Sequence, residues 1–343
     1  MNGQAASITE LSARIEQWLM GLDLGISRLC EVRRADGGKS SETWLITAEG
    51  NDGNRLDWVL RVQARVRQVY EDPSVARQFQ LIRALSTCSS LPIPAAVALE
   101  EDTSILGAPF FLMERAEGKA APDGYHSEGL FTQINPAARE AMWVEGIQML
   151  ARLNCVDPAP LAFLGWPNGP TDDGVAQELA RWDSYLRWTR VPHLPIYEKA
   201  LRWLDDHRPA PNGIGLAWGD ARPCNILYFD GRASALLDWE TASLGTAETD
   251  LGWWIFYDRM MSDAIGVPRL DGLPDAHTTI AIWEAESGRK AQAMEWHIAF
   301  AGYRFAMISE HAIRMGIRDG LMPSGMEGDG NPAVRLLAEL VSK

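Results

Sequence analysis

The chain has 343 residues, enough to bury a large core and to divide into two lobes. Its 46 acidic residues outnumber its 32 basic residues, and the formal net charge of -14 opposes sequence-independent binding to nucleic acid or to an anionic membrane. The four cysteines are widely separated and form no Cys-x-x-Cys pair, so neither a disulfide framework nor a zinc site is indicated, and a reducing, cytoplasmic location is expected. No apolar run is long enough to span a bilayer, and the first 20 residues lack the apolar core of an export signal.

The N-terminal third of the chain predicts a small antiparallel sheet. A helix over 8–20 ends at Gly21. Short apolar or alternating runs then predict five strands, at 28–34, 42–48, 57–63, 95–99 and 109–114. A helix over 73–86 lies between the third and the fourth strand. The segment 118–128 is rich in glycine, proline and polar residues, and it predicts a boundary between two lobes, 1–116 and 117–343.

The second lobe is expected to be mostly helical. Helical patterns occur at 136–154, 174–190, 194–206, 247–262, 276–287, 291–316 and 332–342. One hairpin interrupts them, because the apolar runs 226–229 and 233–237 flank an Asp-Gly pair that is typical of a tight turn. The predicted fold class is therefore α+β: a bilobal, protein-kinase-like fold with a small antiparallel-sheet lobe and a larger helical lobe.

Residues 218–225, Trp-Gly-Asp-Ala-Arg-Pro-Cys-Asn, carry the main chemical signal. In kinases of the protein-kinase architecture, an Asp accepts the proton of the attacking hydroxyl, and an Asn five residues later and a further Asp hold Mg²⁺. Asp220, Asn225 and Asp238 reproduce that order, and the hairpin would bring Asn225 and Asp238 to the same end. Arg222 carries a permanent positive charge that could offset charge on the transferring phosphoryl group. The pattern predicts Asp220 and Arg222 as catalytic residues and Asn225 and Asp238 as ligands of Mg²⁺.

The predicted sheet offers groups for the phosphates of ATP. The turn 36–41 joins the first two strands, and its small residues, Ser40 and Ser41 among them, would let backbone amides approach the phosphates. Arg61 stands on the third strand, where kinases place a Lys that contacts the phosphates. The helix 73–86 offers Gln78 where a Glu usually pairs with that Lys. A neutral amide holds a cation less strongly than a carboxylate does, so this ion pair is expected to be missing or weakened.

The whole chain resembles the aminoglycoside phosphotransferase and choline kinase-like superfamily, especially its bacterial branch similar to the kinase-like domain fused to some acyl-CoA dehydrogenases. The stretches that carry the likeness are 37–44, 59–61, 106–115 and the catalytic segment continuing through 239–245 to 250–253. The resemblance implies an adenine-binding hinge at Met113, Glu114 and Ala116, whose backbone groups would face the purine. It also implies that Asp250 steadies the catalytic loop. Trp218 stands where the family commonly has His, and we expect packing to hold the loop there instead.

The identity of the acceptor is expected to depend on the aromatic-rich helices downstream of Asp250. A cationic aminoglycoside would need clustered carboxylates, whereas a hydroxyacyl-CoA would need basic residues and an apolar slot. The dehydrogenase-linked likeness, together with Arg259 and Arg304, favours an acyl-type or other apolar hydroxylated metabolite. We therefore predict an ATP-dependent O-phosphotransferase that acts on a small molecule, with an aminoglycoside-type kinase as the alternative.

Two further classes are weighed against this prediction. Gln78 and Trp218 favour a nucleotide-binding pseudokinase, and the intact Asp220, Asn225 and Asp238 oppose it. A protein kinase is disfavoured because only residues 239–248 separate Asp238 from the next helix, which is short for docking a peptide. The residues leave the choice between ATP and GTP, and the oligomeric state, open.

Overall fold

The computed structural model describes residues 8–35, 42–64, 68–72, 74–165, 173–191 and 194–342. These residues form two compact units. The N-terminal unit comprises the residues up to 86 together with 94–116. The C-terminal unit comprises 87–93 together with the residues from 117 onwards.

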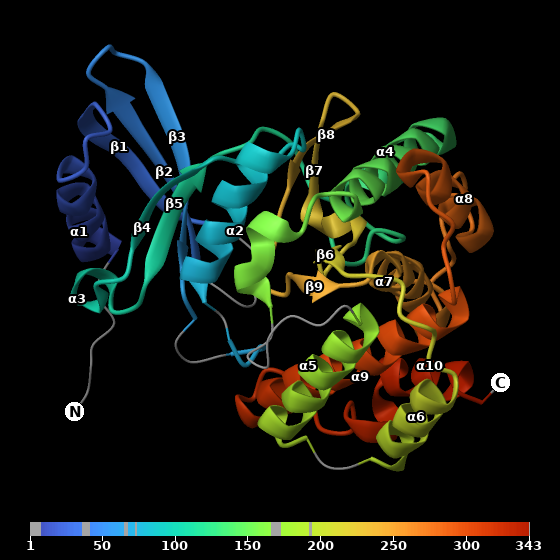
Figure 1. The fold of residues 1–343 in the computed structure, drawn as a ribbon. Helices are drawn as coiled ribbons and strands as arrows, with labels where there is room; N and C mark the ends of the chain where they lie inside the picture. Colours follow the sequence, from blue (N-terminus) through green and yellow to red (C-terminus); the bar gives the residue numbers. More distant parts are fainter. Residues whose placement is uncertain are drawn as a thin grey trace. The chain divides into compact units, whose positions relative to one another are not determined.

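The N-terminal unit is built on a five-stranded antiparallel sheet (Figure 1). Its elements are α1 Ile8–Met20, β1 Ile26–Arg34, β2 Glu42–Gly50, β3 Arg55–Val62, α2 Val75–Cys88, β4 Ala96–Glu100, α3 Thr103–Leu106 and β5 Phe110–Glu114. The strand order is β1-β2-β3-β5-β4, so the first three strands form a meander and β5 lies in the sheet between β3 and β4. The strands predicted from short alternating runs are all present.

Alternation along the strands explains the core of this unit. Trp58, Leu60 and Val62 of β3 are buried and lie on one face of the sheet, because successive side chains of a strand point to opposite faces. Arg61 therefore lies on the opposite face. Helix α1 adds Trp18 to the same core, where its ring meets the edge of Phe110 with 4.7 Å between centroids.

The C-terminal unit is mainly helical (Figure 1). Its helices are α4 Pro136–Asn154, α5 Gly174–Thr189, α6 Pro195–Asp206, α7 Ala247–Met260, α8 Ala276–Ser287, α9 Met294–Arg318 and α10 Pro332–Leu340. Helix α7 is buried along most of its length, as expected for a helix that is apolar on nearly all sides, and it packs against α9. Within the residues described, no helix combines the length and the apolar character needed to cross a bilayer.

Two small sheets interrupt the helices of the C-terminal unit. The hairpin is confirmed, with β7 Ile226–Phe229 paired to β8 Arg232–Leu236 around the turn at Asp230. A second sheet, β6 Gly215–Ala217 paired to β9 Ser243–Gly245, was not predicted from the sequence. Each of its strands has three residues, which is too short for a periodic pattern to show. The expectation that only one hairpin interrupts the helices is therefore wrong.

The α+β class, with an antiparallel sheet followed by a helical region, is confirmed. The helices at 8–20, 136–154 and 276–287 begin and end where the sequence predicted. The strand at 226–229 has the predicted ends as well. The remaining predicted helices and strands differ by one to three residues at one or both ends, where capping and local hydrogen bonds, more than periodicity, decide the boundary.

Candidate active site

The segment 218–225 lies between β6 and β7, and Asp238 lies between β8 and β9. Because β6 pairs with β9 and β7 pairs with β8, the loop from β6 to β7 lies beside the loop from β8 to β9. The backbone N–H of Leu237 donates to the carbonyl oxygen of Asn225 at 2.8 Å. The two short sheets thus bring the residue before Asp238 against Asn225, as the predicted hairpin required.

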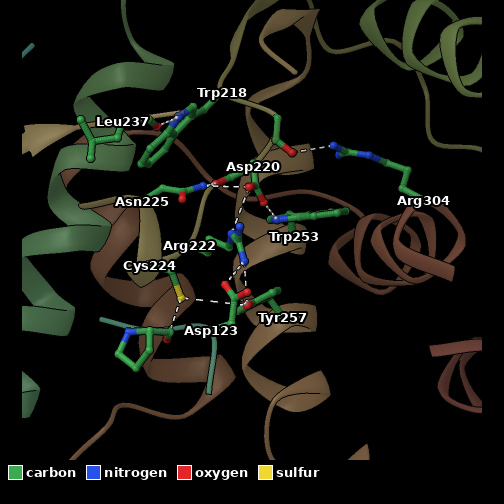
Figure 2. A network of polar contacts seen from close by, with 12 residues as sticks. Asp123, Trp218, Asp220, Arg222, Cys224, Asn225, Leu237, Trp253, Tyr257 and Arg304 are labelled. Carbon is green, nitrogen blue, oxygen red and sulfur yellow. Dashed lines mark hydrogen bonds and ion pairs between the residues drawn. The ribbon is translucent and has the colours of Figure 1, made fainter. Parts of the chain in front are cut away.

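Asp220 accepts three hydrogen bonds through its carboxylate (Figure 2). Its Oδ2 accepts from Nδ2 of Asn225 at 2.8 Å and from Nε of Arg222 at 3.0 Å. Its Oδ1 accepts from Nε1 of Trp253 at 3.0 Å. The residue is 7% exposed, so these donors replace most of the water that a free carboxylate would bind.

The side-chain amide of Asn225 is oriented by its donors. Its Nδ2 donates to the backbone oxygen of Asp220 at 2.8 Å as well as to the carboxylate of Asp220. An amide nitrogen has two hydrogens, so both are used. The Oδ1 of Asn225 is left as the atom that can face a cation.

Asp238 has a backbone φ of 62°, in the left-handed region that non-glycine residues seldom adopt. Asp tolerates this conformation better than most residues, and strain of this kind is often found at functional sites. The residue is half-buried and follows directly on Leu237. Its position at the end of the hairpin is therefore set by the tight backbone path between β8 and β9.

The donors at this site fit magnesium. Asn225 and Asp238 offer only oxygen atoms, which Mg²⁺ prefers, and Mg²⁺ usually takes one or two carboxylates together with substrate phosphates and water. The part of the chain that the structure describes holds no group of three or more His, Cys, Asp or Glu residues able to bind a metal ion. These two residues therefore suit a cation that is held partly by a phosphate ligand, and they do not form an all-protein metal site.

Asp250, fully buried at the start of α7, anchors the segment 218–225. Its Oδ2 accepts from the backbone N–H of Trp218 at 2.7 Å, and its Oδ1 accepts from that of Gly219 at 2.8 Å. Asn154 of α4 donates a third hydrogen bond at 2.9 Å. Burial raises the pKa of Asp250 to about 6, although these donors act to lower it. The contacts match the steadying role that the resemblance implied for Asp250.

Gly219 is also held at its carbonyl oxygen. Nη2 of Arg304, from α9, donates to its carbonyl oxygen at 2.6 Å. The φ of Gly219 is 86°, and a Cβ at this position would lie 2.4 Å from the backbone oxygen of Thr241. Only glycine fits this turn, because both the backbone conformation and the space exclude a side chain.

Trp218 does more than the sequence predicted. The expectation was that packing alone would hold the loop at this position. The ring does pack on Trp239, with 5.4 Å between centroids, but Nε1 also donates to the carbonyl oxygen of Leu237 at 2.9 Å. The indole therefore supplies a hydrogen bond from the segment of Asp220 to the residue before Asp238.

The guanidinium of Arg222 donates hydrogen bonds to side chains of the protein. Its Nε donates to Asp220, and its Nη1 donates to Oδ1 of Asp123 and to the hydroxyl of Tyr257, both at 2.7 Å. The guanidinium also lies over the ring of Tyr257, 4.9 Å from the centroid. Burial works against the charge, but the nearby carboxylates hold the pKa of Arg222 well above its ordinary value. The predicted contact with the phosphoryl group stays a prediction, and Nη2 is the nitrogen not used in these bonds.

The segment that presents Asp123 is fixed by its neighbours. Sγ of Cys224 donates to the carbonyl oxygen of Pro122 at 3.1 Å, and burial raises the pKa of Cys224 to about 12, so the thiol stays neutral. Two residues after Asp123, the hydroxyl of Tyr125 donates to Asp258 of α7 at 2.9 Å. The loop is thereby tied to α7.

The residues predicted to bind nucleotide belong to the N-terminal unit. Ser40 and Ser41 lie outside the described residues. Arg61 of β3 is half-buried and stands opposite Thr43 and Phe111 in the sheet.

The predicted hinge residues lie at and after the end of β5. Met113 and Glu114 end that strand, and Ala116 follows it as the last residue of the unit. The N–H of Glu114 donates to Ala95 at 2.9 Å, so the sheet uses it and it is not available to a purine.

Sequence reasoning missed two contacts of this site. Trp253 donates to Asp220, and it follows Asp250 by three positions, which places both on one face of a helix and was a usable signal. Asp123 lies in the glycine- and proline-rich segment and carried no signal.

The two arginines invoked for an acyl-type acceptor have other roles. Arg304 is fully buried and holds Gly219, and Arg259 pairs with Glu339 at 2.7 Å. Because it is buried, Arg304 offers no basic surface for phosphate groups, and for this residue the expectation is wrong. For Arg259, whose ion pair is partly exposed, it stays a prediction.

Comparisons with known proteins show the family to which this chain belongs. Residues 31–283, well over half of the chain, match the family model described as phosphotransferase enzyme family. Acyl-CoA dehydrogenase family member 10 of Mus musculus is 27% identical over 243 residues, which cover 70% of this chain and 21% of that protein. Acyl-CoA dehydrogenase family member 11 of Pongo abelii is 23% identical over 306 residues, which cover 87% of this chain and 38% of that protein. The chain thus spans less than two-fifths of the length of these relatives.

Solved structures show the same fold. A candidate aminoglycoside phosphotransferase from Ralstonia eutropha JMP134 superposes with a TM-score of 0.72 at 23% identity, and 96% of each chain is covered. A thermostable mutant of aminoglycoside phosphotransferase APH(4)-Ia, in a ternary complex with AMP-PNP and hygromycin B, gives a TM-score of 0.62 at 14% identity over 96% of this chain and 98% of that one. With the family match over residues 31–283, the chain belongs to the phosphotransferase enzyme family, and it is related to acyl-CoA dehydrogenase family members 10 and 11.

Proposed function

We propose that this protein is an ATP-dependent O-phosphotransferase that moves the γ-phosphoryl group of Mg-ATP to a hydroxyl of a small molecule. One observation carries the proposal: the carboxylate of Asp220 and the amide of Asn225 are hydrogen-bonded to each other, and Asn225 is bonded in turn to the residue before Asp238. In this proposal, the proton acceptor and the two oxygen ligands for a cation lie together. Family membership and the complex of a similar fold with AMP-PNP support the same reaction class.

In the proposed reaction, Asp220 accepts the proton of the acceptor hydroxyl as its oxygen attacks the phosphoryl group. Oδ1 of Asn225 and the carboxylate of Asp238 would hold Mg²⁺, which when bound supplies positive charge to the triphosphate. Arg222 stays beside Asp220 and adds a fixed positive charge to the site. Asp250 and Arg304 hold the backbone of Gly219, so that Asp220 is presented without a loop rearrangement.

The nucleotide contacts are proposed for the N-terminal unit. Arg61 would contact the phosphates, and the backbones of Ser40 and Ser41 would approach them. The purine would be held by the backbone of Met113, Glu114 and Ala116. Since the N–H of Glu114 is used by the sheet, we place the hinge hydrogen bonds on carbonyl groups and on the N–H of Ala116.

We propose an apolar or acyl-type hydroxylated metabolite as the acceptor. The relatives named as acyl-CoA dehydrogenase family members support this class. The side chains around Asp220 support it too, because Trp253, Tyr257 and the half-buried Phe305 form one aromatic group, with centroids 5.7 and 5.9 Å from that of Phe305. Such rings offer apolar surface to an acceptor.

An aminoglycoside-type kinase is the second candidate, supported by the complex of a similar fold with hygromycin B. A polycationic acceptor needs carboxylates to bind it. Here Asp123 is paired with Arg222, and Asp258 is paired with Arg269 at 2.7 Å. Because both carboxylates already have cationic partners, we rank this candidate below the apolar acceptor.

A pseudokinase without turnover is the third candidate, supported by Gln78 and by Trp218. A screen for ADP release separates the three. Wild type is incubated with Mg-ATP and a panel of neutral, acyl-type and aminocyclitol alcohols, alongside Asp220→Asn and the matched surface change Asp230→Asn. We expect release with an apolar alcohol, loss of at least about 1000-fold in Asp220→Asn and no change in Asp230→Asn. ATP binding with no release for any alcohol would favour the pseudokinase.

A further inference from the structure

We infer that Trp253 is a positioning residue that holds the carboxylate of Asp220 so that Oδ1 is the atom that accepts the proton. The inference rests on the proposed function and extends it to a residue and an atom.

The first step is the number of donors at each oxygen of Asp220. A carboxylate oxygen offers two lone-pair directions. Oδ2 accepts from Asn225 and from Arg222, so both of its directions are occupied. Among the described residues, Oδ1 accepts only from Trp253, so one direction remains. An incoming hydroxyl can therefore donate to Oδ1 without displacing a protein donor.

The second step is that the ring of Trp253 cannot turn away. The residue is 3% exposed, and its ring lies 4.5 Å from the guanidinium carbon of Arg304 and 5.7 Å from the centroid of Phe305. Arg304 is itself fixed by its bond to the carbonyl oxygen of Gly219. The indole N–H is a donor only, so it can hold Oδ1 but cannot take the proton in place of Asp220.

The third step is the reaction itself. As the O–H bond of the acceptor breaks, its proton passes to Oδ1 of Asp220 and its oxygen forms a bond to the γ-phosphorus of ATP. The bond from that phosphorus to the bridging oxygen breaks, and the electron pair leaves with ADP. Rotation of the carboxylate would misalign Oδ1, and an error of about 1 Å in such a group costs about 100-fold in rate. Trp253 prevents this rotation from the side opposite Asn225.

A matched control lies next to Trp253 on α7. Trp254 is also fully buried, and its Nε1 has no hydrogen-bond partner among the described residues. Trp253→Phe and Trp254→Phe therefore remove the same atoms from the same helix, and only the first removes a donor to Asp220. We expect kcat to fall about 10-fold or more in Trp253→Phe with the KM for ATP within about twofold, and Trp254→Phe to keep the kcat of wild type.

A double-mutant cycle tests whether Trp253 acts through Asp220. In the Asp220→Asn background, Trp253→Phe should cost no further rate, because the proton acceptor is already lost. Equal kcat in Trp253→Phe and Trp254→Phe would overturn the inference. An unchanged penalty in the Asp220→Asn background would overturn it as well.

A second readout does not depend on turnover. The indole N–H resonance of Trp253, identified by its loss in Trp253→Phe, should move in Asp220→Ala, while that of Trp254 should stay in place. If wild type transfers phosphate to no alcohol, the proposed function fails and with it the role of Oδ1 as proton acceptor, and this resonance then decides only whether Trp253 holds the carboxylate of Asp220. A Trp253 signal that Asp220→Ala leaves unmoved would overturn it.

Discussion

The indole N–H of Trp218 donates to the carbonyl oxygen of Leu237 at 2.9 Å, which joins the segment of Asp220 to the residue before Asp238. Both backbones are also fixed elsewhere. Asp250 holds the N–H of Trp218, and Asn225 accepts from the N–H of Leu237. The segment of the proposed base and the residue before the proposed metal ligand are thereby connected through hydrogen bonds.

Removing the hydrogen bond from Trp218 to Leu237 should weaken the positioning of Asp238 relative to Asp220, and with it the binding of Mg²⁺. Trp218→Phe keeps most of the ring but leaves the carbonyl of Leu237 without that donor, so we expect a loss of about 1–3 kcal/mol in the free energy of unfolding. We also expect a rise in the Mg²⁺ concentration needed for half-maximal rate. Trp296→Phe is the control, because it also removes an indole hydrogen bond to a backbone carbonyl, from Nε1 to Leu204 at 2.8 Å, away from the site. A higher Mg²⁺ requirement in both variants would contradict the account.

Asp238 should contribute its charge to metal binding. Asp238→Asn keeps a side chain that tolerates the left-handed backbone but loses the carboxylate, so about 10-fold more Mg²⁺ should be needed for half-maximal rate. Asp230→Asn makes the same change at the other end of the hairpin, where φ is 49°, and should leave the requirement as in wild type. Titration of initial rate against Mg²⁺ at saturating ATP gives the answer, and identical curves for both variants would refute the role of Asp238.

Arg304 should matter for stability far more than Arg259. Arg304→Met removes a buried donor to Gly219 and a charge beside Asp250, and it should cost about 3 kcal/mol or more. Arg259→Met breaks an exposed ion pair with Glu339 and should cost about 0.5 kcal/mol or less. Urea denaturation of the two variants measures both. Similar losses would show that Arg304 does not anchor the loop.

His297 should make stability depend on pH. Burial lowers its pKa to about 3, from an ordinary value of 6.5 that the unfolded chain regains. Below pH 6.5, therefore, His297 is protonated in the unfolded state but stays neutral in the folded state. Stability is full above this pH and falls as the pH decreases towards 3, by about 2 kcal/mol between about pH 7.5 and pH 5.

A variant that does not titrate isolates this effect. The free energy of unfolding of His297→Gln should fall less over the same pH interval than that of wild type, whatever the absolute stability of the variant. Urea denaturation at a series of pH values compares the two slopes. Parallel slopes would mean that His297 does not remain neutral in the folded protein.

The sequence predicted those parts of the fold that have long periodic patterns. Helix α4 and helix α8 have the predicted ends, and the Asp-Gly turn correctly indicated β7 and β8. Strands β6 and β9 were not predicted, because a strand of three residues is too short to show alternation of apolar and polar residues. Their pairing nevertheless brings the two loops of the site together.

The site was predicted where spacing along the chain reflects geometry and missed where contacts are long-range. Asp220 and Asn225 belong to one loop, so their spacing already determined that they meet. Asp123 reaches Arg222 across 99 positions of sequence, and no local pattern encodes such a contact. Arg304 was counted in favour of an acyl-type acceptor, whereas in the structure it is buried among aromatic rings.

The central claim, that Asp220 drives phosphoryl transfer to an alcohol, is tested most directly by single-turnover transfer from γ-labelled Mg-ATP to the alcohol that releases most ADP. The account predicts a labelled phosphate ester with wild type, and at least about 1000-fold slower formation with Asp220→Asn at unchanged affinity for ATP. Ester formation at equal rates by both proteins would contradict it.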